Sequence, residues 1–283
     1  MVWRGVVLIA VATGLLVLPP AVARGAALPP WGRAELGIAR SLLVPHPGFT
    51  PGRGPARTGP AGCEAGLEHG PGSGGPRVAI VGASFTAGVG PGDPGQSWAV
   101  LLARTEHWDA VVYGDPGAGY VRPGVRHQGP VARELTQVGL PALRPALVIV
   151  QAGHDDIGVP PQLVRSRVAQ AIALIRAQAP QARIALLTVF PGRSHAARVY
   201  QTDQAIVTAA RAADHGVIIM DPLTGRWRFP RGRDGLHPTA AGDAAIAVQV
   251  AGILRASGVA PGPAGHGSRI CETAIAGQPP PRR

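Results

Sequence analysis

A serine, an aspartate and a histidine stand in settings that suit nucleophilic catalysis. Ser84 follows an apolar run and Gly82 in RVAIVGASFTAG, and Asp234 and His237 lie three residues apart in DGLHP far downstream. A serine hydroxyl becomes a nucleophile when an imidazole within hydrogen-bond reach takes its proton and a third group orients the imidazole. We therefore interpret Ser84 as a nucleophile, His237 as its base and Asp234 as the orienting acid.

Each residue also has a simpler interpretation. Serine is a preferred helix N-cap, so Ser84 alone would be read as the cap of the helix that follows. Asp234 would likewise be a turn or cap residue before a helix starting near Thr239. The combination of the three residues, and not any one of them, favours chemistry.

The elements that must position these residues are alternating apolar strands and amphipathic helices. Strands are predicted at 77–81, 109–113, 146–151, 183–189 and 216–220, and helices at 96–105, 161–179, 197–214 and 239–256. Such alternation indicates a parallel sheet covered on both faces. We expect an α/β fold: a three-layer α/β/α sandwich of flavodoxin-like type with about five parallel strands.

Polar residues and glycines follow these strands at the edge where open α/β sheets bind ligands. Ser84 follows the first strand, a glycine-rich turn follows the second, and Gly153-His154-Asp155-Asp156 follows the third. The loop with Asp234 and His237 follows the fifth. The sequence thus predicts that these groups converge at one edge of the sheet.

The same residues resemble the SGNH, or GDSL-type, serine hydrolases over about residues 77–256. Gly82-Ala83-Ser84 corresponds to the family's Gly-Asp-Ser block, Gly153-His154-Asp155-Asp156 to its Gly-x-Asn-Asp block, and Asp234, His237 and Pro238 match its Asp-x-x-His-Pro block. The resemblance implies an oxyanion hole made by Ser84, by Gly117 or else Gly119 in Pro-Gly-Ala-Gly-Tyr, and by position 155.

Two positions depart from the family pattern. Ala83 replaces an Asp that supports the nucleophile turn, so we expect a repositioned turn. Asp155 replaces an Asn whose amide donates to the oxyanion, whereas an ionised carboxylate only accepts. Either burial and Asp156 keep Asp155 protonated, or backbone amides suffice, or His154 donates instead, or the protein is a weak catalyst.

Substrate contacts are predicted near the serine. Phe85, Tyr120 and His154 stand beside the expected oxyanion hole, and Trp227 lies among four arginines in RWRFPRGR. Arginine suits carboxylate and phosphate, and an indole offers a stacking face. Alternatively Phe85 and Tyr120 belong to the core, and Trp227 packs onto the domain.

The ends of the chain indicate export. Residues 1–23 have the pattern of a secretory signal peptide, with an uncleaved anchor as the alternative; residues 24–76 form a Pro/Gly-rich arm, 77–257 the folded domain and 258–283 a Gly/Pro-rich tail. We expect the tail to be poorly ordered apart from Cys271. In an exported chain, an even number of cysteines favours a disulfide between Cys63 and Cys271.

The formal net charge of +11 comes from arginines scattered along the chain, without a basic stripe or interleaved aromatics. This pattern argues against nucleic-acid binding and leaves attraction to an anionic cell envelope as a weak expectation. No metal-ligand spacing or phosphate loop is present, so no cofactor or metal is expected, and the protein is expected to be a monomer.

The signal pattern and the resemblance together imply a secreted or envelope serine esterase acting on small acyl esters, such as acetyl groups on carbohydrate or short lipid esters. Two alternatives remain open. One is an envelope-binding protein on the same scaffold with weak or lost catalysis, and the other is an acyltransferase.

Overall fold

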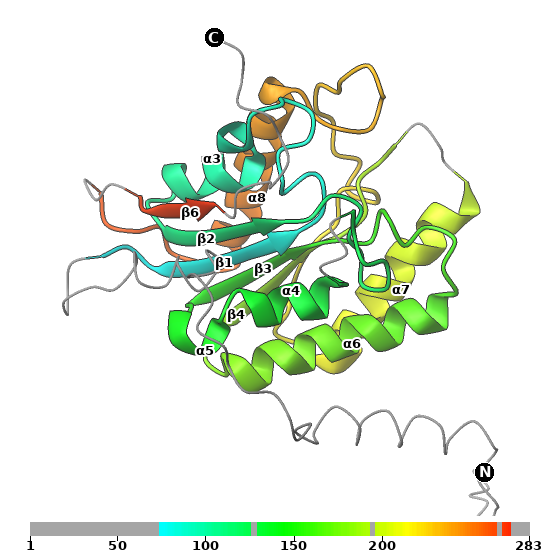
Figure 1. Cartoon of the computed structure of the whole chain (residues 1–283), viewed down its shortest axis with the longest axis horizontal. Helices are drawn as coiled ribbons and strands as arrows, with labels where there is room; N and C mark the ends of the chain where they lie inside the picture. Colours follow the sequence, from blue (N-terminus) through cyan, green and yellow to red (C-terminus); the bar gives the residue numbers. More distant parts are fainter. Residues whose placement is uncertain (1–73, 126–128, 193–195, 265–267, 273–283) are drawn as a thin grey trace, which may run out of the picture. The chain divides into compact units, whose positions relative to one another are not determined.

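Six parallel strands form one sheet in a computed structural model that describes residues 74–125, 129–192, 196–264 and 268–272 (Figure 1). The strands are β1 (Arg77–Gly82), β2 (Asp109–Gly114), β3 (Leu147–Gln151), β4 (Arg183–Leu187), β5 (Ile218–Met220) and β6 (Ile270–Glu272). They lie in the order β5-β4-β3-β1-β2-β6. The central strands are buried along almost their whole length, as a parallel sheet covered on both faces requires.

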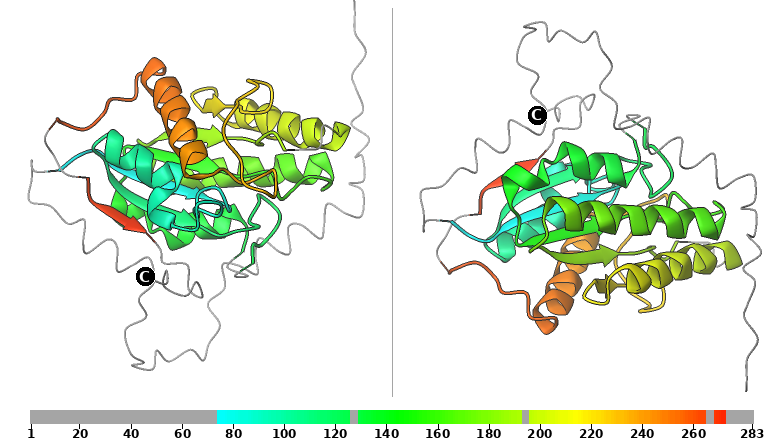
Figure 2. Two further views of the ribbon diagram at one scale, coloured as in Figure 1. Left: turned by 90° about the horizontal axis from the view of Figure 1, so that it is seen from above. Right: turned by 90° about the horizontal axis from the view of Figure 1, so that it is seen from below.

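Helices cover both faces of the sheet (Figure 2). They are α3 (Trp98–Thr105), α4 (Val131–Gln137), α5 (Leu140–Leu143), α6 (Pro161–Gln178), α7 (Ala197–Ala213) and α8 (Ala240–Ala256), with a short 3₁₀ helix η1 (Pro94–Gln96) before α3. Helices α3 and α8 pack together and bury one apolar cluster against the sheet, and α4, α6 and α7 bury the other. The three-layer α/β sandwich expected from the sequence is therefore confirmed.

The strand order reverses its direction beside β1. The chain runs outward from β1 to β2, and then returns to β3 on the other side of β1 before continuing to β4 and β5. Because parallel crossovers are right-handed, this reversal sends the connecting helices to opposite faces. The carboxyl ends of β1 and β3 flank the reversal point, which is where open α/β sheets bind ligands.

The first and last helices of the domain are joined by a buried polar contact. Asp243 in α8 accepts a hydrogen bond from the Trp98 backbone N–H at the start of α3, with an N···O distance of 2.9 Å. Side chains also cap both helices: Ser97 accepts from the Val100 N–H and Thr239 from the Gly242 N–H. Backbone donors that a helix leaves unpaired at its N-terminus are satisfied in this way.

Besides the short 3₁₀ helix η1, the sequence missed three elements. Helices α4 and α5 are only seven and four residues long, too short for a clear apolar period. The tail was expected to be poorly ordered apart from Cys271; for residues 270–272 strand β6 corrects this expectation, because they pair in parallel with Ala110–Val112 of β2. Ile270 packs against the apolar cluster under α3 and α8. This burial helps to stabilise a strand of only three residues at the edge of the sheet.

Several sequence predictions lie outside the described residues. The signal segment 1–23, most of the arm and Cys63 belong to this part of the chain, so cleavage of the signal and the Cys63–Cys271 disulfide stay predictions. Within the ranges that the structure does describe, none of the helices has the length and apolar character needed to cross a bilayer.

Candidate active site

Ser84 lies in a tight turn directly after β1. The Ser84 carbonyl accepts from the Val89 N–H at 3.0 Å and the Ala83 carbonyl from the Ala87 N–H at 3.0 Å, so the residues after the serine coil into a helical turn. Gly82 is needed before this turn, because a β-carbon there would overlap the Thr86 hydroxyl and the Gln151 carbonyl. The turn leaves Ser84 9 % exposed at the carboxyl edge of the sheet.

Asp234 and His237 are held by a compact loop between β5 and α8. One Asp234 oxygen, Oδ1, accepts from the Leu236 and His237 backbone N–H groups at 2.9 and 3.0 Å. The loop closes on itself through the Gly232 N–H, which donates to the His237 carbonyl at 2.9 Å. The bond from Leu236, and then the interaction with His237, lower the pKa of Asp234, so its carboxylate is ionised at neutral pH.

The two loops meet through a glycine. A β-carbon on Gly90, in the loop after Ser84, would overlap the carbonyl oxygen of Pro238. Gly90 also has a φ of 130°, a backbone conformation that L-residues with a side chain rarely adopt. A residue without a side chain is therefore required where the serine loop packs on the histidine loop.

The structure brings the three predicted residues into a continuous hydrogen-bonded chain, called here the relay. His237 Nε2 lies 2.9 Å from Ser84 Oγ, and His237 Nδ1 lies 2.6 Å from Asp234 Oδ2. With the Nδ1 proton on the side of the carboxylate, Nε2 has a lone pair available for the serine hydroxyl. The exposed fractions of the His237 and Asp234 side chains, 19 % and 51 %, show that solvent reaches the acid end of the relay.

In the glycine-rich turn after β2, the hydrogen bonds distinguish the two glycines, Gly117 and Gly119, that could donate to an oxyanion. The Gly119 N–H is already bonded to the Arg122 carbonyl at 3.0 Å. For the N–H groups of Gly117 and Ser84, no acceptor is found within the described ranges. Gly117 has a φ of 81°, which suits glycine. Gly117 is therefore the better of the two candidates for donating to an oxyanion.

Asp156 fixes the same turn from the β3–α6 loop. Its carboxylate accepts three backbone bonds, from Tyr120 at 2.7 Å and from Val121 and Arg122 at 3.1 Å each. Burial raises the pKa of Asp156, and these three bonds oppose the shift. Its role was not predicted from the sequence, although its place in a cluster of acidic residues behind a strand was a signal.

Asp155 lies in a partly buried position that disfavours its charged form. Burial raises the pKa of Asp155 to about 6, the charge of Asp156 adds to the shift, and His237 opposes it. Burial and the charge of Asp156 therefore both favour the protonated form of Asp155, which is the direction expected from the sequence. For the neighbouring His154, burial lowers the pKa, so His154 is neutral at pH 7.

Three residues predicted near the substrate lie in the core. Phe85 is buried and stacks on Phe190, with ring centroids 4.1 Å apart, and Tyr120 is also buried. Trp227 packs edge-on against Phe190 at 6.3 Å and is buried. For these residues the structure shows the packing alternative, and Phe85 also contacts the His237 ring at a centroid distance of 5.5 Å.

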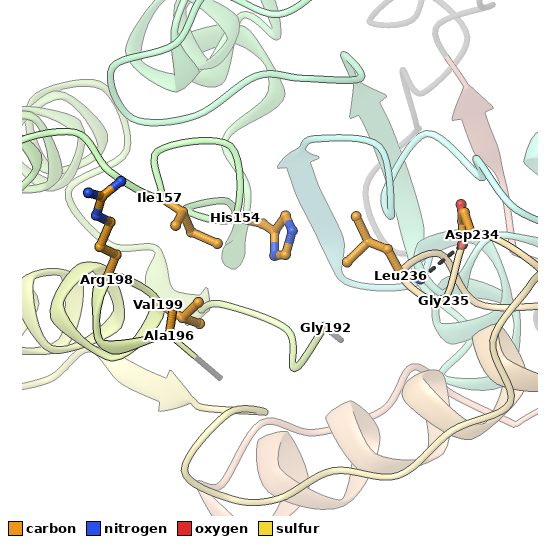
Figure 3. Close-up of a pocket in the computed structure, with 9 residues that line it drawn as sticks. All are labelled: His154, Ile157, Gly192, Ala196, Arg198, Val199, Asp234, Gly235 and Leu236. Carbon is orange, nitrogen blue, oxygen red and sulfur yellow. Dashed lines mark hydrogen bonds between the residues drawn. The ribbon is translucent and has the colours of Figure 1, made fainter. Parts of the chain in front are cut away.

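A pocket of about 240 Å³ opens beside the acid end of the relay (Figure 3). His154 and Ile157 lie on one side, Ala196 and Val199 on the other, and Leu236 lies next to the loop of Asp234. Gly192, Arg198, Asp234 and Gly235 complete its lining. Of these residues only His154 was predicted as a substrate contact, because the residues of α7 carry no motif that marks a pocket.

No cluster of three or more His, Cys, Asp or Glu side chains that could hold a metal ion occurs among residues 74–125, 129–192, 196–264 and 268–272. At this edge of the sheet the relay brings together a serine hydroxyl, an imidazole and a carboxylate, beside the backbone amides of Ser84 and Gly117. An arrangement of this kind suits attack on a carbonyl carbon, with proton transfer through the imidazole.

Comparison with known proteins places these observations in a family. A family model described as "GDSL-like Lipase/Acylhydrolase family" matches residues 80–245. No curated protein sequence gives a significant match.

Several solved structures share the fold. A carbohydrate esterase family 2 enzyme with a carbohydrate-binding domain from Corynascus thermopiles (Myceliophthora fergusii) aligns with a TM-score of 0.56 and 19 % identity over 68 % of this chain and 69 % of that chain. A family two carbohydrate esterase from Cellvibrio japonicus aligns with a TM-score of 0.56 and 15 % identity over 67 % and 63 %. One from Clostridium thermocellum, in complex with cellohexaose, aligns with a TM-score of 0.53 and 15 % identity over 67 % and 66 %.

Proposed function

Because the chain belongs to the GDSL-like lipase/acylhydrolase family, we propose that it is an exported serine esterase that hydrolyses small acyl esters. In this proposal Ser84 is the nucleophile, His237 the general base and Asp234 the orienting acid. The observation that carries it is the relay: 2.9 Å from Ser84 Oγ to His237 Nε2 and 2.6 Å from His237 Nδ1 to Asp234 Oδ2.

The proposed reaction has two halves. Ser84 Oγ attacks the ester carbonyl carbon while its proton passes to His237 Nε2, and the carbonyl π electrons move to oxygen. When the tetrahedral intermediate collapses, the bond to the alcohol oxygen breaks and His237 returns the proton to that oxygen. Water then attacks the acyl-serine by the same route, releasing the acid and restoring Ser84. Asp234, ionised because of its lowered pKa, stabilises the imidazolium in both halves.

The oxyanion would be held by the backbone amides of Ser84 and Gly117, whose N–H groups have no partner within the described ranges. Preorganised donors of this kind usually supply a large share of the rate enhancement. Asp155 would donate only in its protonated form, which burial and Asp156 favour.

The pocket supports small acyl esters as substrates. Its volume of about 240 Å³ and the apolar side chains of Ile157, Val199 and Leu236 suit a short acyl chain or one face of a sugar ring. The carbohydrate esterases of similar fold make acetylated carbohydrate the first substrate class to test, with short lipid esters second. At under 20 % identity this argument rests on the fold and the pocket together.

Two other candidates have specific support. An ionised Asp155 would repel the oxyanion, which favours a binding protein with weak catalysis. An acyltransferase would use the same relay with a second alcohol in place of water. The 51 % exposure of Asp234 leaves the relay open to solvent, and this favours hydrolysis over transfer.

Export, retention at the envelope and the monomeric state are also proposals. The signal pattern in residues 1–23 and the net charge of +11 support the first two. Intact mass of the protein recovered outside the cell would test removal of the signal, and mass with and without a reductant would test the Cys63–Cys271 disulfide. Light scattering of the mature protein would test the monomer.

The main test is reaction with a fluorophosphonate followed by peptide mapping. Wild-type protein should be labelled at Ser84, and Ser84→Ala and His237→Ala should lose labelling and ester hydrolysis. Ser257→Ala and His215→Ala change the same residue types away from the relay and should behave as wild type. If folded wild-type protein is neither labelled nor active on any ester of an acetylated-glycan and p-nitrophenyl panel, the esterase proposal is wrong.

A further inference from the structure

The serine turn is anchored by a buried glutamine from the neighbouring strand. Gln151 is the last residue of β3, is 1 % exposed, and directs its side chain at the turn after β1. Its Oε1 accepts from the Ala83 N–H at 3.2 Å, the Thr86 N–H at 3.3 Å and the Thr86 hydroxyl at 3.0 Å. Because all three partners are donors, the side-chain oxygen and not its NH₂ group must face the turn.

These contacts lie on both sides of Ser84, the proposed nucleophile. Ala83 directly precedes Ser84, and Thr86 follows it by two residues, so one oxygen fixes the backbone on both sides of the serine. The Ala83 N–H is also within 3.2 Å of the Gln151 carbonyl. Position 82 must be a glycine for the turn to approach this closely, since a β-carbon there would overlap both Thr86 and Gln151.

The turn has no polar side chain of its own at position 83. Ala83 is buried and its methyl group makes no hydrogen bond. The anchoring that a polar residue inside the turn would provide comes instead from the next strand of the sheet. β1 and β3 pair in register through Gly82 and Gln151, which brings the glutamine opposite the turn.

We propose that Gln151 is a positioning residue that holds Ser84 in reactive geometry toward His237. This inference rests on the proposed function, since it concerns the same nucleophile. Gln151 acts through the backbone of the turn and touches neither the relay nor the substrate. A nucleophile displaced by about 1 Å can lose about 100-fold in rate, so the anchor should influence kcat strongly and KM little.

The test compares two substitutions of similar size. Gln151→Met removes the side-chain acceptor and leaves the two Thr86 donors, its N–H and its hydroxyl, without a partner, while the Ala83 N–H keeps the Gln151 carbonyl. Gln151→Glu keeps side-chain oxygens that can accept all three bonds. We expect Gln151→Met to lower kcat and the rate of Ser84 phosphonylation about 100-fold, with KM within about twofold of wild type. Gln151→Glu should stay within about tenfold of wild type. Gln170→Met, an exposed position on α6, is the matched control and should have no effect.

A purely structural role would give a different result. Gln151→Met would then be less stable, but its folded fraction, measured by active-site titration at low temperature, would keep the wild-type kcat, and the inference would be overturned. If Gln151→Met does not fold, Thr86→Val removes one of the three donors from a buried site of nearly the same shape. This variant should lower kcat about threefold to tenfold, and an unchanged kcat would overturn the inference.

The two proposals fail in distinguishable ways. If the wild type is not labelled at Ser84, the esterase proposal fails before any variant is compared. If the wild type is labelled and hydrolyses esters, while the folded Gln151 and Thr86 variants match its kcat and labelling rate, only the positioning role of Gln151 fails.

Discussion

Replacing Asp155 by Asn should raise esterase activity most at alkaline pH. Burial, reinforced by Asp156, raises the pKa of Asp155 to about 6, so at pH 8 only about 1 % of the wild-type molecules carry a protonated Asp155, whereas at pH 5 about 90 % do. The carboxylate present at pH 8 cannot donate and repels a developing oxyanion. An asparagine amide donates at every pH.

The magnitude follows from what one oxyanion donor contributes. Loss of such a donor lowers kcat by roughly 100- to 1000-fold, so Asp155→Asn should raise kcat at pH 8 by about 100-fold. At pH 5, where most Asp155 is protonated, the gain should be less than about tenfold. Asp155→Ala removes the charge without supplying a donor, and we expect a gain at pH 8 well below that of Asn.

The assay is the pH–rate profile of p-nitrophenyl acetate hydrolysis between pH 5 and 9 for the wild type and both variants, followed at the isosbestic wavelength of p-nitrophenol. A gain that is equal at pH 5 and pH 8, or absent at both, would refute the reasoning, because ionised Asp155 would then not oppose the reaction. Labelling of Ser84 by a fluorophosphonate should show the same pH dependence, which separates the chemical step from product release.

Three further predictions concern the carboxylates around the site and the pocket. Burial raises the pKa of Asp243 to about 7; the folded state therefore holds this proton more tightly than the unfolded state, and wild-type stability should fall as pH rises from about 4 through about 7, by up to about 4 kcal/mol. Urea unfolding at pH 5 and pH 8 should show a smaller pH difference in Asp243→Asn, and an equal difference would assign the effect to other groups. Asp156→Ala should lower stability by about 3 kcal/mol or more, because three backbone donors lose their acceptor; thermal unfolding checks this, and an unchanged midpoint would contradict it. Val199→Phe should fill the pocket and reduce kcat/KM for butyrate esters at least tenfold more than for acetate, whereas Val248→Phe, at an exposed position on α8, should not alter this ratio.

The sequence predicted the layers of the fold because its strands are apolar along most of their length and alternate with amphipathic helices. Five strands and four helices were located to within about two residues at most ends. Strand β6 escaped prediction because a three-residue segment in a Gly/Pro-rich tail has no period, and only pairing with β2 makes it a strand. Helices α4 and α5 were not predicted either, because segments of seven and four residues are too short to show a helical period.

The candidate site was predictable where residue type itself suggests chemistry. Ser84, Asp234 and His237 carry such types in recognisable motifs, and the structure brings them within hydrogen-bond distance. Gln151 and Asp156 act by satisfying backbone donors of loops that are distant in sequence. No local pattern reveals which amides those side chains will reach, so tertiary structure was needed to find them.

The contact between Asp243 in the last helix and the Trp98 amide in the first has a consequence for biosynthesis. The proposed nucleophile, Ser84, leaves the ribosome early, but its proposed base, His237, is in the loop that directly precedes α8, and Thr239 joins the two by capping α8 and donating its N–H to the Pro230 carbonyl of that loop. A nascent chain that still lacks α8 should therefore have a serine without a positioned base. Such a chain should be chemically silent, and the proposed hydrolytic activity should begin only when synthesis of the domain is nearly complete.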